Sequence, residues 1–510
     1  MLGGSVGVSA WVGAPSAFAQ RLTEGIEQRY ELQLTASEGR TPLWLQANRY
    51  GLGSLSEVNG YVRGAVLRPV EQDSLRRWGI GYGADLALTQ GYEGSNNRLV
   101  VQQLYAEVRY RAALLTLGQK EQPMELKPQE LSSGSQTLGI NARPTPGVRL
   151  SLPDYWALPK TGGWLALKGH MSYGMMTDGG WQERWTRETS HYAKLVMLHT
   201  KAGYLRIGPD DEGHRYSLEM GLEMACQFGG TMYHTQFGTV EGARGMKAYW
   251  NALIGGGSDE VDATYHNVGG NQLGSWVARV NYQWGEGVRL SVYADHFFED
   301  HSSMLLLDYD GYGEGEEWNL RKENRYLLYG LKDGLLGAEL RLLRCPWLSD
   351  IVIEYMNTRY QSGPIYHDHN PGLSDHIGGD DNYYNHYLYQ GWSHWGQVMG
   401  NPLYRSPLYN DDATLTIGDN RFYGWHMGLK GGCKRVDYRL LASWQRGYGT
   451  YQHPLPDVAD NLSMMAEATV RLPERWGRGW QLRAALGLDH GSLLGNHAGG
   501  QLTLIYHLKD

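Results

Sequence analysis

The chain has 510 residues and a formal net charge of -8, so it offers no excess of basic residues for binding nucleic acid. Its mean hydropathy is -0.48, and no stretch of roughly 18 uncharged apolar residues follows the N-terminus, which excludes a bundle of membrane-spanning helices. The 69 Gly, 35 Tyr and 18 Trp, against only 6 Phe, favour aromatic side chains with a polar group, which prefer a membrane interface. No linker rich in Pro, Gly or Ser divides the chain, so we expect one large domain.

The N-terminus is predicted to be a signal peptide that covers residues 1–19. An apolar run leads into the tripeptide Ala17-Phe18-Ala19, which matches the A-x-A pattern of a cleavage site. Because no Lys or Arg precedes the apolar run, a buried N-terminal strand is the alternative. We therefore expect an exported protein whose single domain covers residues 20–510.

Segments with strict two-residue periodicity recur along the rest of the chain. Between Trp78 and Leu88 every large apolar side chain lies at an even position, with only Gly, Asp or Ala between. The same alternation is found in the segments 218–224, 276–282, 436–444, 480–488 and 502–508. Such strands are typical of an antiparallel β-barrel with lipid outside and a polar lumen inside. A soluble β-sandwich or propeller is the alternative.

The topology follows from counting strands back from the C-terminus, where we expect strands near 351–360, 421–430, 435–446, 462–471, 480–489 and 499–508. Outer-membrane barrels keep short turns on the periplasmic side and long loops outside. Short connections are predicted at 285–287, 344–350, 431–434 and 472–479, and long outer segments at 227–274, 298–334 and 361–420. Residues 246–253 have a helical pattern, and the segment 120–163 is left unplaced. In total we expect an even number of strands, roughly 16 to 20.

The side chains predicted to face the lumen carry nearly balanced charges. The acidic ones are Asp85, Glu107, Glu219, Glu223, Asp295, Glu354, Asp437 and Asp489, and the basic ones are Arg109, Lys168, Arg279, Arg289, Lys430, Arg439 and Arg483. A selective pore is lined mainly by one sign of charge, whereas a packed interior pairs its buried charges. We therefore expect loops to plug the lumen, so that the protein binds rather than conducts. A porin or transport barrel for a small solute is the alternative.

A candidate polysaccharide site lies in the segment 380–404, which mixes aromatic and polar side chains. Sugar rings stack on aromatic side chains, and their hydroxyls need planar donors and acceptors. We expect stacking by Trp392, Trp395, Tyr383 and Tyr384, and hydrogen bonding by Asp380, Asp381 and His394. A polymer that engages several such sites gains affinity by multivalency. The alternative is that these rings form the interface girdle or pack within the loop.

Two catalytic alternatives rest on less specific patterns. The His-Asp-His triplet at 367–369, with the acidic and His side chains at 375–381, could hold a divalent metal. A serine in the segment 132–135 could act as a nucleophile, although no G-x-S-x-G motif occurs. The three cysteines are far apart in the sequence and have no metal-binding spacing. We expect no enzymatic activity, no metal and no cofactor.

Several loop motifs resemble those of the Wzi family of outer-membrane capsule assembly proteins, in its Bacteroidetes form. They are L-S-S-G-S at 131–135, N-A-R-P at 141–144, G-N-Q-L-G-S-W at 270–276, F-E-D-H-S at 298–302, Q-S-G-P at 361–364 and G-W-S-H-W-G at 391–396. The resemblance runs from about Tyr30 to the C-terminus. It implies a barrel of about 18 strands with an occluded lumen, acting as a lectin that anchors capsular polysaccharide at the cell surface.

The sequence thus predicts an all-β protein, a transmembrane antiparallel barrel of about 18 strands with long extracellular loops, in the cell outer membrane. We expect it to be a monomer. Its partners are capsular or other surface polysaccharide and outer-membrane lipid, with no nucleic acid. The expected function is to bind and anchor polysaccharide during capsule assembly.

Overall fold

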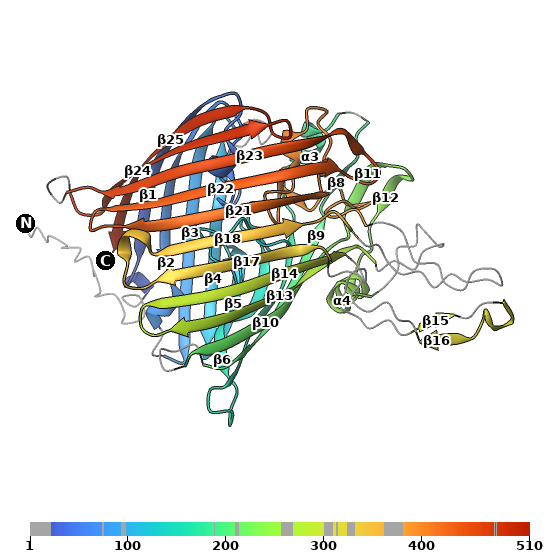
Figure 1. Cartoon of the computed structure of the whole chain (residues 1–510), viewed down its shortest axis with the longest axis horizontal. Helices are drawn as coiled ribbons and strands as arrows, with labels where there is room; N and C mark the ends of the chain where they lie inside the picture. Colours follow the sequence, from blue (N-terminus) through green and yellow to red (C-terminus); the bar gives the residue numbers. More distant parts are fainter. Residues whose placement is uncertain are drawn as a thin grey trace, which may run out of the picture.

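The computed structural model describes residues 22–509 apart from 74–75, 93–97, 188, 210–213, 257–268, 300–309, 313–314, 324–331, 362–380, 474 and 476. Within these residues, 18 strands form one antiparallel sheet. The sheet closes into a barrel because β1 (Glu27–Glu38) pairs with both β2 (Val58–Arg68) and the last strand, β25 (His497–Lys509) (Figure 1). The predicted fold class and the even number of strands are confirmed. The predicted signal peptide, 1–19, lies outside the described residues.

The other wall strands follow in chain order, each paired with the next. They are β3 (Trp78–Gln90), β4 (Leu99–Tyr110), β5 (Ala113–Gln119), β6 (Gly147–Ala157), β7 (Leu165–Met175), β9 (Met197–Ile207), β10 (Tyr216–Phe228), β13 (Asn271–Trp284), β14 (Val288–Glu299), β17 (Gly334–Leu342), β18 (Asp350–Asn357), β21 (Phe422–Gly432), β22 (Val436–Gly449), β23 (Pro454–Arg471) and β24 (Trp480–Gly491). The six strands predicted nearest the C-terminus are all present, although β23 begins earlier than expected, at Pro454.

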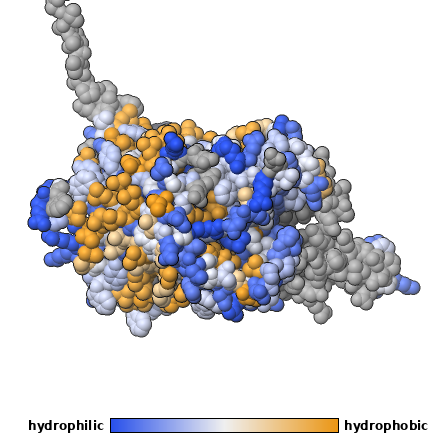
Figure 2. Space-filling model, turned by 90° about the horizontal axis from the view of Figure 1, so that it is seen from above, coloured by the Kyte–Doolittle hydropathy of each residue, from blue (hydrophilic) through white to orange (hydrophobic). Residues whose placement is uncertain are grey.

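The outward face of the wall is apolar, as the periodicity predicts. On β24, Leu486 and Leu488 are 71% and 42% exposed, whereas Ala485 and Asp489 on the other face are buried. Met220 on β10 is also exposed. Figure 2 shows a broad apolar area on the wall, which is the surface that hydrocarbon would cover in a membrane. Exposed aromatic side chains lie at or near the wall's edges: Tyr30, Trp78, Tyr110, Trp156, Trp164, Tyr216, Trp284, Trp347 and Trp425.

The two ends of the barrel differ in the length of their connections. Short connections, such as 111–112, 285–287 and 433–435, lie at the end where β1 begins and β25 ends (Figure 1). The long connections lie at the opposite end, which we name the outer end because outer-membrane barrels carry their long loops outside. The unplaced segment 120–163 divides into an outer connection, 120–146, the strand β6, and a short connection at the other end.

Several short helices and strands lie at the outer end. They are α3 (Trp181–Trp185), the sheet of β8 (Tyr192–Lys194), β11 (Thr231–Thr235) and β12 (Gly238–Glu241), the helix α4 (Met246–Ile254), the hairpin of β15 (Asp310–Tyr312) and β16 (Arg321–Glu323), and the 3-10 turn η2 (Gly315–Glu317). The α4 helix confirms the helical pattern predicted at 246–253. It packs on the outside of β10, where Ala248 and Ala252 cover Cys226. Cys226 continues the outward-facing row of β10, and this helix buries it. None of the described helices is long and apolar enough to cross a bilayer.

Three connections of the outer end fold back into the lumen, and together we name them the plug: residues 39–57, 120–146 and 381–421. They contain α2 (Leu43–Gln46), β19 (Ser393–His394), β20 (Gln397–Val398) and the 3-10 turn η5 (Pro407–Tyr409), while η1 (Val70–Asp73) and η4 (Pro346–Leu348) lie in short turns at the other end. The largest buried cluster joins the plug to the inner face of the wall, with Leu45, Trp392 and Tyr404 beside Phe297 and Met465. The predicted occlusion of the lumen is confirmed.

Candidate functional site

The plug is fixed to the wall by buried carboxylates, the first of which is Glu354 on β18. Its Oε1 accepts hydrogen bonds from the Ser132 hydroxyl and the Tyr293 hydroxyl, both at 2.6 Å, and its Oε2 accepts one from the Ser133 backbone N–H at 2.8 Å. The L-S-S-G-S motif therefore holds the plug in place. Among the described contacts of Ser132 and Ser133 there is no histidine base, so the structure gives no support to a serine hydrolase.

The second attachment is a buried ion pair at the inner face of the wall. Lys127 Nζ, in the plug, lies 2.8 Å from Asp295 Oδ2 on β14, and both side chains are almost fully buried. Burial lowers the pKa of Lys127, but the carboxylates of Asp295 and Glu223 outweigh that effect and hold the pKa above its usual value. Lys127 therefore stays charged and compensates carboxylates that would otherwise be buried without a counter-ion.

Further polar contacts join the plug to the strands around the barrel. They are Leu43 N to Asp489 Oδ2 at 2.9 Å, Trp44 Nε1 to Ser443 Oγ at 3.1 Å, Thr137 Oγ1 to Ser275 Oγ at 2.7 Å, and Tyr384 N to Glu299 Oε1 at 2.6 Å. Ion pairs also lie on the wall itself, between Arg63 and Asp85 and between Arg279 and Glu339. The expectation that paired charges fill the lumen is confirmed for these residues.

The structure places most of the predicted polysaccharide-binding rings inside the plug. Tyr383 and Tyr384 are 0% exposed and Trp392 is 1% exposed. The Tyr384 ring lies 4.0 Å from that of Tyr404, and Trp392 Nε1 donates to the Thr137 carbonyl at 3.0 Å. The expectation that these rings are accessible is therefore corrected: a plug needs an apolar core, and large aromatic side chains supply it. Direct sugar contact by them stays an untested prediction.

Of the other predicted site residues, two are buried, one is half-buried and one lies outside the described part of the chain. Asp381 and His394 are 8% and 3% exposed, and Asp380 is not among the described residues. His394 Nδ1 lies 2.7 Å from the Arg143 carbonyl oxygen, and burial lowers the pKa of His394. Trp395 is half-buried, with the Arg143 guanidinium 4.3 Å from its ring centroid. Of the described members of the predicted set, Trp395 keeps the most exposure.

The predicted metal triplet at 367–369 lies outside the described residues. In the described part of the chain, no three His, Cys, Asp or Glu side chains are grouped in a way that could hold a metal ion. Of the three cysteines, Cys226 is buried, Cys345 is half-buried and Cys433 is exposed.

Sequence reasoning missed an aromatic cluster at the outer end, in which Trp181 and Tyr192 are buried. We name it the outer aromatic layer: Trp181, Trp185, Tyr192, Tyr233 and Trp395. The rings of Trp181 and Trp185 stack at 5.7 Å, and those of Tyr192 and Tyr233 stack at 4.9 Å. Trp185, Tyr233 and Trp395 are half-buried. The W-Q-E-R-W segment of α3 was the available signal, because its two indoles lie one helical turn apart.

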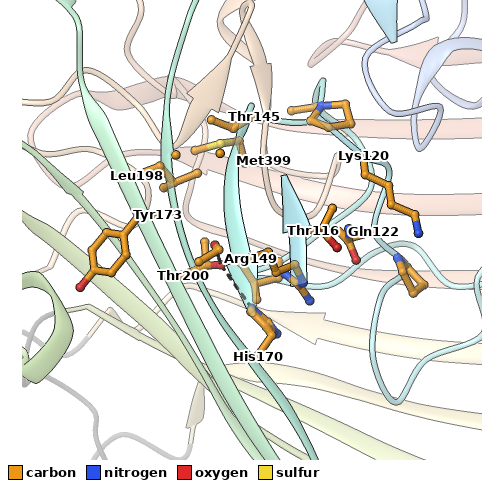
Figure 3. Close-up of a pocket in the computed structure, with 18 of the residues that line it drawn as sticks. Thr116, Lys120, Gln122, Thr145, Arg149, His170, Tyr173, Leu198, Thr200 and Met399 are labelled. Atoms are coloured by element: carbon orange, nitrogen blue, oxygen red, sulfur yellow. Dashed lines mark hydrogen bonds between the residues drawn. The ribbon is translucent and has the colours of Figure 1, made fainter. Parts of the chain in front are cut away.

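A cavity of about 170 Å³ lies between the plug and the inner face of β5, β6, β7 and β9 (Figure 3). Arg149, His170, Thr200 and Met399 line it, with Thr200 Oγ1 3.2 Å from His170 Nε2. Figure 3 shows the Tyr173 ring pointing away from these side chains. The lining offers hydroxyl and guanidinium groups beside apolar atoms, a mixture that suits a polar ring. The volume is below the roughly 300–1,000 Å³ of pockets for drug-sized ligands, so it suits one sugar unit at most.

A larger cavity, of about 1060 Å³, lies opposite the outer end, where β1 begins and β25 ends. Trp347, Arg471 and Arg483 are among its lining residues. It adjoins a smaller cavity of about 230 Å³, which shares Arg439, Glu467 and Arg483 and reaches Trp44 and Ser132 of the plug. The lumen therefore contains empty space at this end, and this space extends to the plug.

No protein-family model and no curated protein sequence matches the chain. Among solved structures it is similar to Wzi of Escherichia coli, an outer-membrane protein involved in group 1 capsule assembly and described as a carbohydrate-binding β-barrel. The TM-score is 0.53 at 14% identity, over 93% of this chain and 83% of that one. Also similar are OccK9 (OpdG) of Pseudomonas aeruginosa (TM-score 0.47, 10% identity, 95% and 98% covered) and OccK8 (OprE) of the same organism (0.45, 8%, 96% and 99%). The chain is therefore an outer-membrane barrel with a Wzi-like fold.

Proposed function

We propose that this protein is a non-enzymatic, lectin-like barrel that binds a long-chain surface polysaccharide and anchors it to the outer membrane during capsule assembly. The observation that carries the proposal is the plug. Its buried Lys127–Asp295 pair and its hydrogen bonds to Glu354 hold it in the lumen, so the barrel is built to stay closed. A closed barrel with long outer loops is suited to binding at the surface.

The class of ligand comes from the similarity to Wzi. Carbohydrate binding is described for that protein, and its barrel matches most of this chain. We extend the property to this chain as a proposal, and it agrees with the loop motifs that resemble the Wzi family.

We place the sugar contacts on the outer aromatic layer. Trp185, Tyr233 and Trp395 are half-buried there, so each offers part of a ring face to a ligand. Phe237, on the adjoining β11–β12 turn, is 46% exposed. Stacked rings held by their neighbours lose little freedom when a sugar binds, and a polymer gains by touching several of them.

The test is a binding titration of the purified, folded barrel with capsular polysaccharide from the producing strain. We expect the double variant Trp185→Ala, Trp395→Ala to bind roughly tenfold more weakly, because each lost stacking contact is worth about 0.5–1.5 kcal/mol. Trp250→Ala, which truncates an exposed ring on α4, is the matched control and should bind normally. Equal affinity for the double variant and the control would contradict this placement.

A transport barrel is the second candidate. The observation that favours it is the cavity of about 1060 Å³ opposite the outer end. Conductance in planar bilayers separates the two. A closed lectin gives no steady current, whereas a steady open current that a small solute blocks would favour transport.

A further inference from the structure

Cationic and aromatic side chains gather at the outer ends of neighbouring strands β17, β18, β21 and β22. We name them the outer-rim cluster: Lys332, Arg359, Tyr360, Arg421, Tyr423 and Tyr451. Lys332 precedes β17, Arg359 and Tyr360 follow β18, Arg421 and Tyr423 lie at the start of β21, and Tyr451 lies in the turn after β22. Figure 1 shows these strand ends side by side at the outer end. The cluster is thus assembled from three separate connections and the start of β21.

The cluster lies on the outside of the barrel. Phe422 is 0% exposed and faces the lumen, so its neighbours Arg421 and Tyr423 lie on the opposite face of β21. Trp425 and Met427 continue the same outward row and are 52% and 43% exposed. The row therefore passes from the cluster at the rim directly into the lipid-facing belt.

Aromatic rings hold the two arginines in place. The Arg421 guanidinium carbon lies 3.6 Å from the Tyr451 ring centroid, and that of Arg359 lies 4.5 Å from the Tyr423 centroid. Arg359 Nε donates to Asn357 Oδ1 at 2.8 Å, and the Tyr451 hydroxyl donates to the Arg359 carbonyl at 3.1 Å. Both guanidinium groups are therefore ordered before any ligand binds, which lowers the entropy cost of binding.

Among the described residues, the cations of the cluster have no acidic partner: none of Lys332, Arg359 and Arg421 has a carboxylate oxygen within 4.0 Å. The neighbouring Arg446 differs, because its Nε and Nη2 donate to the two carboxylate oxygens of Asp460 at 2.7 and 2.9 Å. Three adjacent cations with no carboxylate partner in the described part of the chain leave several N–H donors available to an anion.

We propose that the outer-rim cluster binds a phosphate group of an outer-leaflet lipid. The outer leaflet of an outer membrane is built from lipid A, whose phosphates lie at the interface and whose acyl chains run down the wall. Guanidinium groups match phosphate oxygens in charge and in bidentate geometry. Trp425 and Met427, just below the cluster, supply the apolar surface for the acyl chains. This site is separate in its residues from the outer aromatic layer.

The experiment measures lipid binding to the purified barrel in detergent by native mass spectrometry. The probes are lipid A with both phosphates, the same lipid after removal of its phosphates, and inorganic phosphate. We expect tight binding of phosphorylated lipid A only, reduced about tenfold or more by Arg359→Gln, Arg421→Gln. Arg446→Gln is the matched control, and its effect should be clearly smaller because Asp460 already occupies that guanidinium.

Several outcomes would overturn the proposal. Equal binding of the two lipid forms by the unmodified protein would do so without any variant. Binding of inorganic phosphate as tight as that of the lipid would also overturn it, as would normal lipid A binding by the double variant. The proposal would fail as well if the cluster bound an acidic polysaccharide in place of lipid. Heat-dependent migration on a gel checks that each variant is a folded barrel, and Arg421→Gln alone serves if the double variant does not fold.

Discussion

Cationic side chains are arranged in opposite ways in two regions of the molecule. One region is the contact between the plug and the wall, and the other is the outer-rim cluster. In the lumen Lys127 is buried among the carboxylates of Asp295 and Glu223, so its charge is compensated. At the rim, Arg359 and Arg421 lie against tyrosine rings, and no carboxylate of the residues that the structure describes pairs with them. Burial makes an unpaired charge costly, whereas a charge at the interface keeps its water until a ligand replaces it. Paired charges therefore mark structure here, and unpaired ordered charges mark a binding surface.

The largest effect on the stability of the fold is expected from breaking the Lys127–Asp295 ion pair. Lys127→Met leaves Asp295 and Glu223 buried without their cation, which should cost about 3–5 kcal/mol of stability. Denaturant unfolding of the barrel in detergent measures the loss. The control is Lys168→Met, because Lys168 pairs with Glu125 at 2.7 Å while both side chains keep partial contact with water. That variant should lose about 1 kcal/mol or less. A similar small loss for Lys127→Met would remove the distinction between the two regions.

The next effect concerns the buried rings of the plug. Trp392→Leu removes an indole that is 1% exposed, together with its hydrogen bond to the Thr137 carbonyl. We expect the free energy of unfolding to fall by about 2–3 kcal/mol, which is less than the roughly 3–5 kcal/mol that truncation of a buried Trp to Ala costs. Unfolding and polysaccharide titration are measured on the same sample. If Trp392 acts as a core residue, stability falls while affinity is retained. Lost affinity with unchanged stability would instead support the stacking role predicted from the sequence.

The smallest effect is a dependence of plug stability on pH. His386 Nδ1 accepts a hydrogen bond from the Leu388 backbone N–H at 3.1 Å, and His191 Nδ1 lies 2.7 Å from Gln390 Nε2, so both rings act as neutral acceptors. Burial lowers the pKa of His386 to about 3 and that of His191 to about 4, from 6.5.

Because the unfolded segment takes up these protons first, the stabilisation is complete above pH of about 6.5 and is lost as the pH falls toward 4. Hydrogen exchange of residues 382–399, corrected for the intrinsic rate, should therefore be faster at pH 5 than at pH 7.5. His386→Asn keeps an acceptor that does not titrate and should weaken this dependence. Protection that does not change with pH in the unmodified protein would contradict the assignment.

The wall of the barrel could be predicted from sequence because its pattern is local. A strand places alternate side chains on opposite faces, so Leu486 and Leu488 face outward whatever the rest of the chain does. The difference in length between the connections then gives the two ends. The balance of acidic and basic side chains on the inner face also predicted a filled lumen, since buried charges need partners.

The candidate site was harder to predict because a loop has no such period. The aromatic residues of 381–404 look alike in sequence, yet Tyr383 and Trp392 form the core of the plug while Trp395 reaches its surface. Trp185 and Tyr233 join Trp395 only because two other loops lie beside it. The same reason explains Cys226, which α4 covers from outside.

The sequence alone determined the barrel, its orientation and the closed lumen, because each follows from periodicity, loop length and charge balance along short stretches of chain. The tertiary structure alone decided which loops enter the lumen, which rings they bury and which described cations at the rim have no carboxylate partner. Those outcomes depend on contacts such as Ser132 with Glu354, far apart in the sequence, or Arg421 with Tyr451, at the ends of neighbouring strands. Such contacts leave no periodic pattern along the chain.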